Sequence, residues 1–179
     1  MRLDKRKKNY PNLPNGEFAF VGWHEQQQTL TLITDPAGSR PLYYIAQHNQ
    51  IAFATDIESL LPFCRDSSEL DAASVEEFLV NGIRRAPDQS LVRGIKKAPP
   101  ATRVQISRSK KLSRTYWRPE NAPSLGKMSD EAYFQMGREI LKSCIQDRLQ
   151  ANPNVAVHLS GGLDSSAIEC RFILPSRKS

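Results

Sequence analysis

The sequence predicts an α+β fold built on an antiparallel sheet, followed by the start of a parallel α/β layer. Short apolar segments separated by turn-forming residues recur between residues 18 and 55, which is typical of antiparallel hairpins. Near the carboxyl end, a long amphipathic helix pattern precedes an apolar segment, a glycine turn and a second helix start. That order of elements is found where a parallel α/β layer begins.

The first part of the chain contains the strand signals. We expect strands at residues 18–23, 29–34, 42–46, 51–55, 102–106 and 115–117. We expect a brief helix capped by Asp56 and ended by Pro62. A second helix is expected to begin with a capping box from Ser74 to Glu77, and Gly82 is a suitable stop.

The composition is that of an ordinary globular protein. Apolar residues make up 39% and charged residues 25%, and no apolar stretch has the length of a membrane span. The basic first ten residues are followed by prolines rather than an apolar segment, so we expect no secretory signal and a cytoplasmic location. The net charge of +6 comes from dispersed basic clusters without an aromatic platform, so we expect solvated loops and no nucleic-acid partner.

Several single residues carry weaker expectations. Asp35 and Arg40 share a turn between strands, where a structural ion pair is favoured over catalysis. His24 is expected to be exposed, and His158 to be a partly buried structural residue. The three cysteines show no metal-ligand spacing and are expected to be buried, reduced thiols.

The segment after the long helix carries the strongest chemical signal. The apolar residues Val155–Leu159 predict a strand, and the following residues read Ser160-Gly161-Gly162-Leu163-Asp164-Ser165-Ser166. A glycine turn that opens a helix lets a phosphate approach the backbone, and the helix amides and dipole favour negative charge. Asp164 adds a carboxylate where Mg²⁺ could bridge to those phosphates.

This segment resembles the pyrophosphatase loop of enzymes that activate a substrate with ATP and release pyrophosphate. By itself it fits asparagine, GMP and NAD synthetases and tRNA-modifying ligases. Residues 16–20, 35–44 and 53–61 resemble the back half of the glutaminase domain of glutamine-hydrolysing asparagine synthetases. Residues 94–100, followed by Tyr116-Trp117, look like the crossover into the synthetase domain of that family.

The resemblance implies a domain order. Residues 1–120 would be an incomplete class II glutamine amidotransferase-like domain and its crossover. Residues 121–179 would be the start of an ATP pyrophosphatase domain of the adenine nucleotide α-hydrolase-like type. The implied reaction is adenylation of a carboxylate, with aspartate the leading substrate, release of AMP and pyrophosphate, and asparagine as product; a homodimer is left open.

The resemblance also assigns roles within the loop. Asp164 would take Mg²⁺, and Leu159 would lie against the ATP through its backbone. The remaining loop residues would hold the phosphates, namely Ser160, Gly161, Gly162, Ser165 and Ser166.

The sequence departs from the family pattern at both ends. Arg2 stands where these glutaminases carry their nucleophilic cysteine, so we expect no glutaminase activity and assign no catalytic residue. We expect a shortened or frame-shifted gene product, poor packing after about Ser129 and no ATP–pyrophosphate exchange. The alternatives are a β-lactam synthetase or lasso-peptide cyclase, whose glutaminase-like half has lost that cysteine, and a non-enzymatic interaction module.

Overall fold

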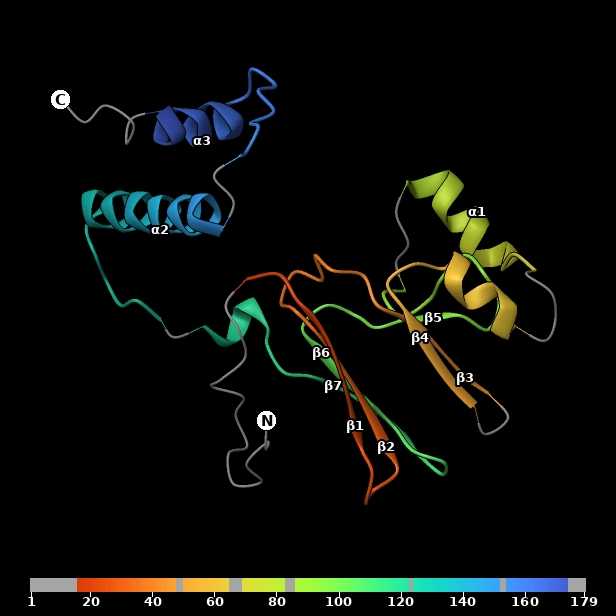
Figure 1. Cartoon of the computed structure of the whole chain (residues 1–179). Coiled ribbons are helices and arrows are strands. Elements are labelled where there is room, and N and C mark those ends of the chain that lie inside the picture. The colour runs from red at the N-terminus through yellow and green to blue at the C-terminus, as the bar shows by residue number, and fades with distance from the viewer. Residues whose placement is uncertain are drawn as a thin grey trace. The chain divides into compact units, whose positions relative to one another are not determined.

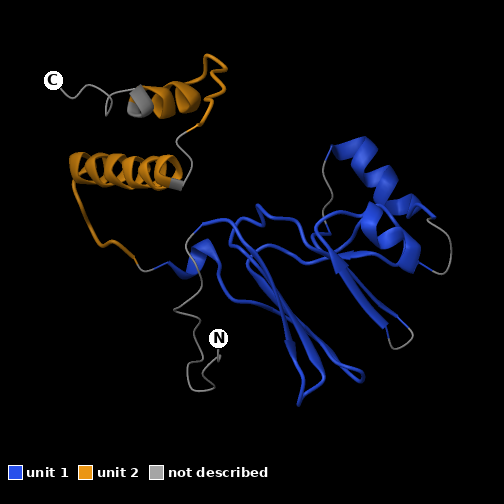
Figure 2. Ribbon diagram, viewed as in Figure 1, with its two compact units in different colours: residues 1–122 blue, residues 123–179 orange. Residues whose placement is uncertain are grey.

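The computed structural model describes residues 16–47, 50–64, 69–82, 86–122, 124–151 and 154–173. Arg2, on which the expected lack of glutaminase activity rests, lies outside these ranges. The chain divides into two compact units, residues 1–122 and 123–179, which are described separately below (Figure 2).

Seven strands of the first unit form two antiparallel sheets (Figure 1). One sheet has the order β1-β2-β6-β7 and the other the order β4-β3-β5. The strands are β1 (Ala19–His24), β2 (Thr29–Thr34), β3 (Tyr43–Gln47), β4 (Gln50–Ala54), β5 (Lys96–Lys97), β6 (Thr102–Ile106) and β7 (Lys111–Thr115). The antiparallel prediction is confirmed, but the single sheet expected over residues 18–55 is wrong, because β2 pairs with β6 whereas β3 pairs with β5.

The facing sides of the two sheets share one core. Leu32 of β2 lies opposite Val104 of β6, and both are fully buried. Tyr44 of β3 packs into the same cluster, together with Leu30, Leu42 and Ile106. The alternation of the strands therefore sends these side chains inward from both sheets.

Strand β3 is buried on its second face as well. Ile45, the neighbour of Tyr44, points to a second cluster with Leu60, Val92 and Ile95. Leu60 belongs to a short 3₁₀ helix, η1 (Glu58–Phe63). Asp56 accepts the Ser59 amide at 2.8 Å near its start, as predicted, but Pro62 lies inside this helix rather than ending it.

Helix α1 (Ala72–Asn81) begins earlier than predicted. Asp71 is its cap, and its Oδ1 accepts the backbone N–H of Ser74 at 2.8 Å. Ser74 is instead buried inside the helix, and its hydroxyl donates to Oε1 of Gln89 at 3.1 Å. The predicted capping box is therefore wrong, because the aspartate three residues upstream supplies the acceptor; the stop at Gly82 is confirmed.

A buried carboxylate organises the turn between the two sheets. Asp35 is only 2% exposed and accepts four backbone N–H groups at 3.0–3.3 Å, from Phe18, Ala37, Ser39 and Arg40. Burial by itself would raise the pKa of this carboxyl, but the four donors outweigh burial and hold the pKa of Asp35 below its ordinary value.

The expected ion pair between Asp35 and Arg40 takes another form. Asp35 binds the backbone N–H of Arg40, and the Arg40 guanidinium faces Glu17, with 3.6 Å between Nε and Oε2. The backbone amide is the nearer donor because a turn of this kind directs successive N–H groups at the aspartate.

The same turn is tied to the segments that flank β6. The Ala101 amide donates to the Asp35 carbonyl at 2.9 Å, and the Thr34 hydroxyl donates to the Pro99 carbonyl. The Tyr116 hydroxyl donates to the Thr34 carbonyl at 2.6 Å. Burial, followed by the charge of Asp35, raises the pKa of Tyr116, so the phenol keeps its proton and remains a donor.

The second unit contains two helices, α2 (Asp130–Ala151) and α3 (Leu163–Ile173). The Ser129 hydroxyl accepts the Ala132 amide at 3.3 Å, which agrees with the predicted helix start. No side chain among those described in this unit is buried, in line with the expected loose packing.

The strand predicted at Val155–Leu159 is not formed. Residues 154–160 are irregular and pair with no other strand among the described residues. A parallel strand is defined by its neighbours in the sheet, and this unit contributes no described strand beside it.

Three side-chain expectations also need correction. His158, Cys144 and Cys170 are exposed, because the described residues of the second unit form no buried interior that could hold them. Cys64 is half-buried, and burial raises the pKa of its thiol. His24 is exposed, as predicted. No described helix combines the length and apolar character that crossing a membrane requires.

Asp35→Ala should lower the free energy of unfolding by about 1–3 kcal/mol or more, because four amide donors lose their acceptor. Thermal and urea unfolding measure this loss. Asp56→Ala is the matched control, since that carboxylate is exposed and its hydrogen bonds come only from Ser59 and its own backbone. Equal losses in the two variants would contradict the role of Asp35.

The stability that Asp35 contributes should also depend on pH. A carboxyl whose pKa is lowered on folding stabilises the fold above its unfolded pKa of about 3.9 and loses this contribution as pH falls through the lower folded pKa. The stability gap between wild type and Asp35→Ala, measured by urea unfolding, should therefore narrow in this acid range. A gap that stays constant down to pH 2 would contradict this account.

Asp71→Ala should destabilise the first unit by about 1 kcal/mol through loss of the α1 cap. Asp71→Ser should retain most of the stability that the cap contributes. Circular dichroism melts of the full chain measure both changes. Identical melting of Asp71→Ala and wild type would show that the cap contributes nothing.

Candidate functional site

The loop between residues 160 and 163 bends sharply before α3. Gly161 has φ +79°, a conformation that L side chains rarely adopt, and a Cβ placed there would meet no atom within 4 Å. The backbone at this bend therefore faces open space, which a ligand group could enter.

Two serines close the base of the bend. The hydroxyls of Ser160 and Ser165 lie 3.1 Å apart. Ser165 also donates to the Gly162 carbonyl at 3.1 Å, and the Ser160 amide donates to the Ser165 hydroxyl at 3.3 Å. These bonds hold the bend against the first turn of α3, so the structure brings Ser160, Gly162 and Ser165 together.

The first turn of α3 has unused backbone donors. Ser166 is the first residue whose amide returns to the loop, at 3.1 Å from the Gly162 carbonyl. No described residue accepts the amides of Leu163, Asp164 or Ser165. Unpaired N–H groups and the helix dipole together favour an anion at this position.

Asp164 is the one carboxylate of the loop, and it is exposed in the first turn of α3. No group of three potential metal-binding side chains occurs in the described part of the chain. Mg²⁺ suits such a site, because it is commonly bound by one or two carboxylates together with substrate phosphates. The donor set therefore fits a magnesium ion that arrives with a phosphate ligand.

A pocket of about 600 Å³ adjoins the loop within the second unit. Ser160, Asp164 and Ser165 line one side of it. Helices α2 and α3, which lie side by side in Figure 1, supply apolar walls that include Leu141, Ile145, Leu149 and Ile168. The amphipathic spacing of α2 predicts this apolar face, but it carries no signal that the face lies beside the loop.

Four other predicted residues do not line the pocket, and two of them, Gly161 and Gly162, form the bend itself. Leu159 is 50% exposed and does not line it, and Ser166 is half-buried beside the bend.

Family comparisons agree with this division of the chain. Residues 7–117 match the family described as "Glutamine amidotransferase domain", and residues 136–172 match "Asparagine synthase". The second match contains the whole loop from Ser160 to Ser166.

Individual relatives are similar over both parts. The chain is 28% identical over 154 residues to "Asparagine synthetase [glutamine-hydrolyzing] 3" of Bacillus subtilis, covering 86% of this chain and 25% of the relative. It is 31% identical over 160 residues to "Amidase chry2" of Gibberella zeae, covering 86% and 22%. It is 25% identical over 155 residues to "Asparagine synthetase [glutamine-hydrolyzing] 1" of B. subtilis, covering 86% and 24%.

The chain thus spans about a quarter of the length of the curated relatives it matches. The order of the two matched regions is that predicted from the sequence motifs. A glutamine amidotransferase domain followed by an asparagine synthase segment shows that the chain belongs to the asparagine synthetase family.

Proposed function

We propose that the loop at residues 160–166 binds the phosphates of Mg-ATP for an asparagine synthetase-type ligase. The reaction is adenylation of a carboxylate by ATP, with aspartate as the leading substrate, which releases pyrophosphate. Ammonia then attacks the acyl-adenylate, forms the amide and displaces AMP. The proposal places the chain in the cytoplasm, where ATP is available.

The observation that carries the proposal is the open bend at Gly161 together with the unpaired amides of Leu163, Asp164 and Ser165 that follow it. A glycine bend admits a phosphate to within hydrogen-bonding reach of the backbone, and the start of a helix attracts its charge. The match to "Asparagine synthase" over residues 136–172 supports the reaction class.

In this proposal the loop stabilises the charge that grows on the departing pyrophosphate. Backbone donors fixed by the helix do not have to reorganise during the reaction, which is the source of their effect. Ser160 and Ser165, now bonded to each other, would turn their hydroxyls toward the phosphate oxygens. Asp164 would hold Mg²⁺, which neutralises phosphate charge when bound.

Asp164→Asn should weaken the magnesium-dependent binding of pyrophosphate by about tenfold or more, because the amide has lost the charge that holds the cation. Isothermal titration of the full chain with pyrophosphate, with and without Mg²⁺, measures this change. Asp147→Asn is the matched control, since Asp147 is exposed on α2 and does not line the pocket. Affinity that is equal in wild type and Asp164→Asn, or independent of Mg²⁺, would contradict the proposal.

A further inference from the structure

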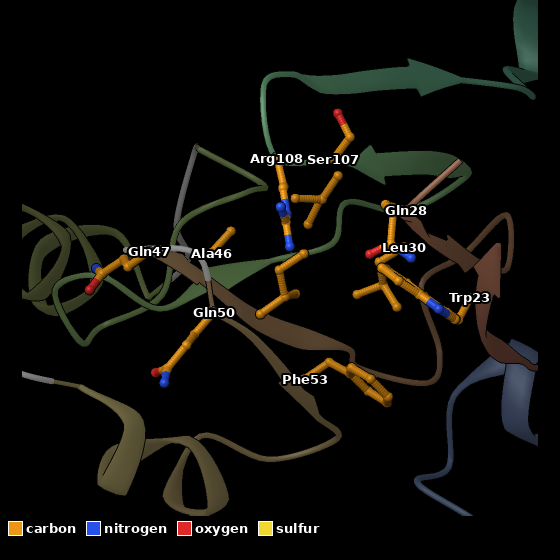
Figure 3. Close-up of a pocket in the computed structure, with 11 residues that line it drawn as sticks. Trp23, Gln28, Leu30, Ala46, Gln47, Gln50, Phe53, Ser107 and Arg108 are labelled. Carbon is orange, nitrogen blue, oxygen red and sulfur yellow. The ribbon is translucent and has the colours of Figure 1, made fainter. Parts of the chain in front are cut away.

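A second cavity, of about 410 Å³, lies in the first unit, between the two sheets (Figure 3). Its lining comes from β1, β2, β3, β4 and the end of β6. The hairpin turns that follow β1 and β6 contribute Gln28 and Arg108. The volume lies within the range of about 300–1,000 Å³ that small-molecule sites occupy.

The base of this cavity is apolar. Leu30 and Ile106 are 6% and 4% exposed and belong to the core that the two sheets share. Ile51 of β4 packs against the same core from the other sheet. The cavity is therefore the open end of the core, where the facing sheets no longer fill the space between them.

Two large aromatic side chains border the cavity and remain about half exposed. Trp23 of β1 is 54% exposed and Phe53 of β4 is 47% exposed. Figure 3 shows both rings at one side of the cavity, although they come from different sheets. Flat rings left in water at a cavity wall favour a ligand that is itself flat and apolar.

Arg108 supplies a charge at the same cavity. Its side chain points into the cavity from the turn that follows β6 (Figure 3). In the part of the chain that the structure describes, no acidic side chain forms an ion pair with Arg108. A guanidinium group binds a carboxylate through two parallel hydrogen bonds, a geometry that fixes the orientation of the acid.

We propose that this cavity binds a small aromatic carboxylate. The ring of the ligand lies over Leu30 and Ile106 against Trp23 and Phe53, and its carboxylate pairs with Arg108. The site shares no residue with the loop at residues 160–166, so the inference does not depend on the proposed ATP reaction. A peptide segment in the same cavity is a different occupant, which the test below distinguishes.

The probe is 2-naphthoate, titrated into the full chain and followed by amide chemical shifts and calorimetry. We expect saturable binding, with shifts at Trp23, Phe53 and Arg108. Arg108→Gln should weaken it at least tenfold. The control Arg114→Gln, an exposed arginine of β7 that does not line the cavity, should leave it unchanged. The neutral 2-naphthamide should bind at least tenfold more weakly than the acid.

Phe53→Leu tests the aromatic wall with little loss of apolar volume, and we expect it to weaken binding severalfold. Circular dichroism melts verify that each variant is folded. Failure of 2-naphthoate to saturate at millimolar concentration, shifts confined to another surface, or equal affinity for acid and amide would each overturn the proposal. If an uncharged strand-forming peptide binds the cavity and 2-naphthoate does not compete with it, the cavity would be assigned to a polypeptide instead.

Discussion

The fold of the first unit depends on how the Asp35 carboxylate is satisfied after burial. A buried charge is stable only when donors replace the water it has lost, and here four backbone amides do so. Those amides belong to the residue that precedes β1 and to the turn before β3. The carboxylate therefore fixes the point where the chain passes from one sheet to the other. The hydrogen bond from Tyr116 to Thr34 ties the end of β7 to the same point.

This change of sheet creates both the core and the cavity. Because β2 and β3 lie in different sheets, their inward side chains face each other, and Leu32 and Tyr44 share one cluster. Ile45, on the opposite face of β3, packs into a second cluster that includes Leu60 of η1. The two sheets enclose less at the end where the β1–β2 and β6–β7 hairpins turn, which leaves Trp23 and Phe53 exposed beside an arginine.

The second unit separates local from long-range structure. The bend at residues 160–166 is held by hydrogen bonds between residues no more than five apart, so it forms without a sheet. The preceding strand depends on neighbours that the described residues do not supply, and it stays irregular. A loop with the geometry for a phosphate can therefore exist where the surrounding α/β layer is absent from the described chain.

The sequence by itself determined whatever depends on near neighbours. Strand alternation, the Gly82 stop, the Ser129 start and the glycine bend could all be predicted, as could the family, from ordered motifs. Tertiary structure decided which strands pair, which aspartate caps α1, and whether residues 155–159 become a strand. It alone brought Trp23, Phe53 and Arg108 to one cavity. The reason is physical: strand pairing and burial depend on residues far apart in the chain. The periodicity of one segment does not identify the segment with which it pairs.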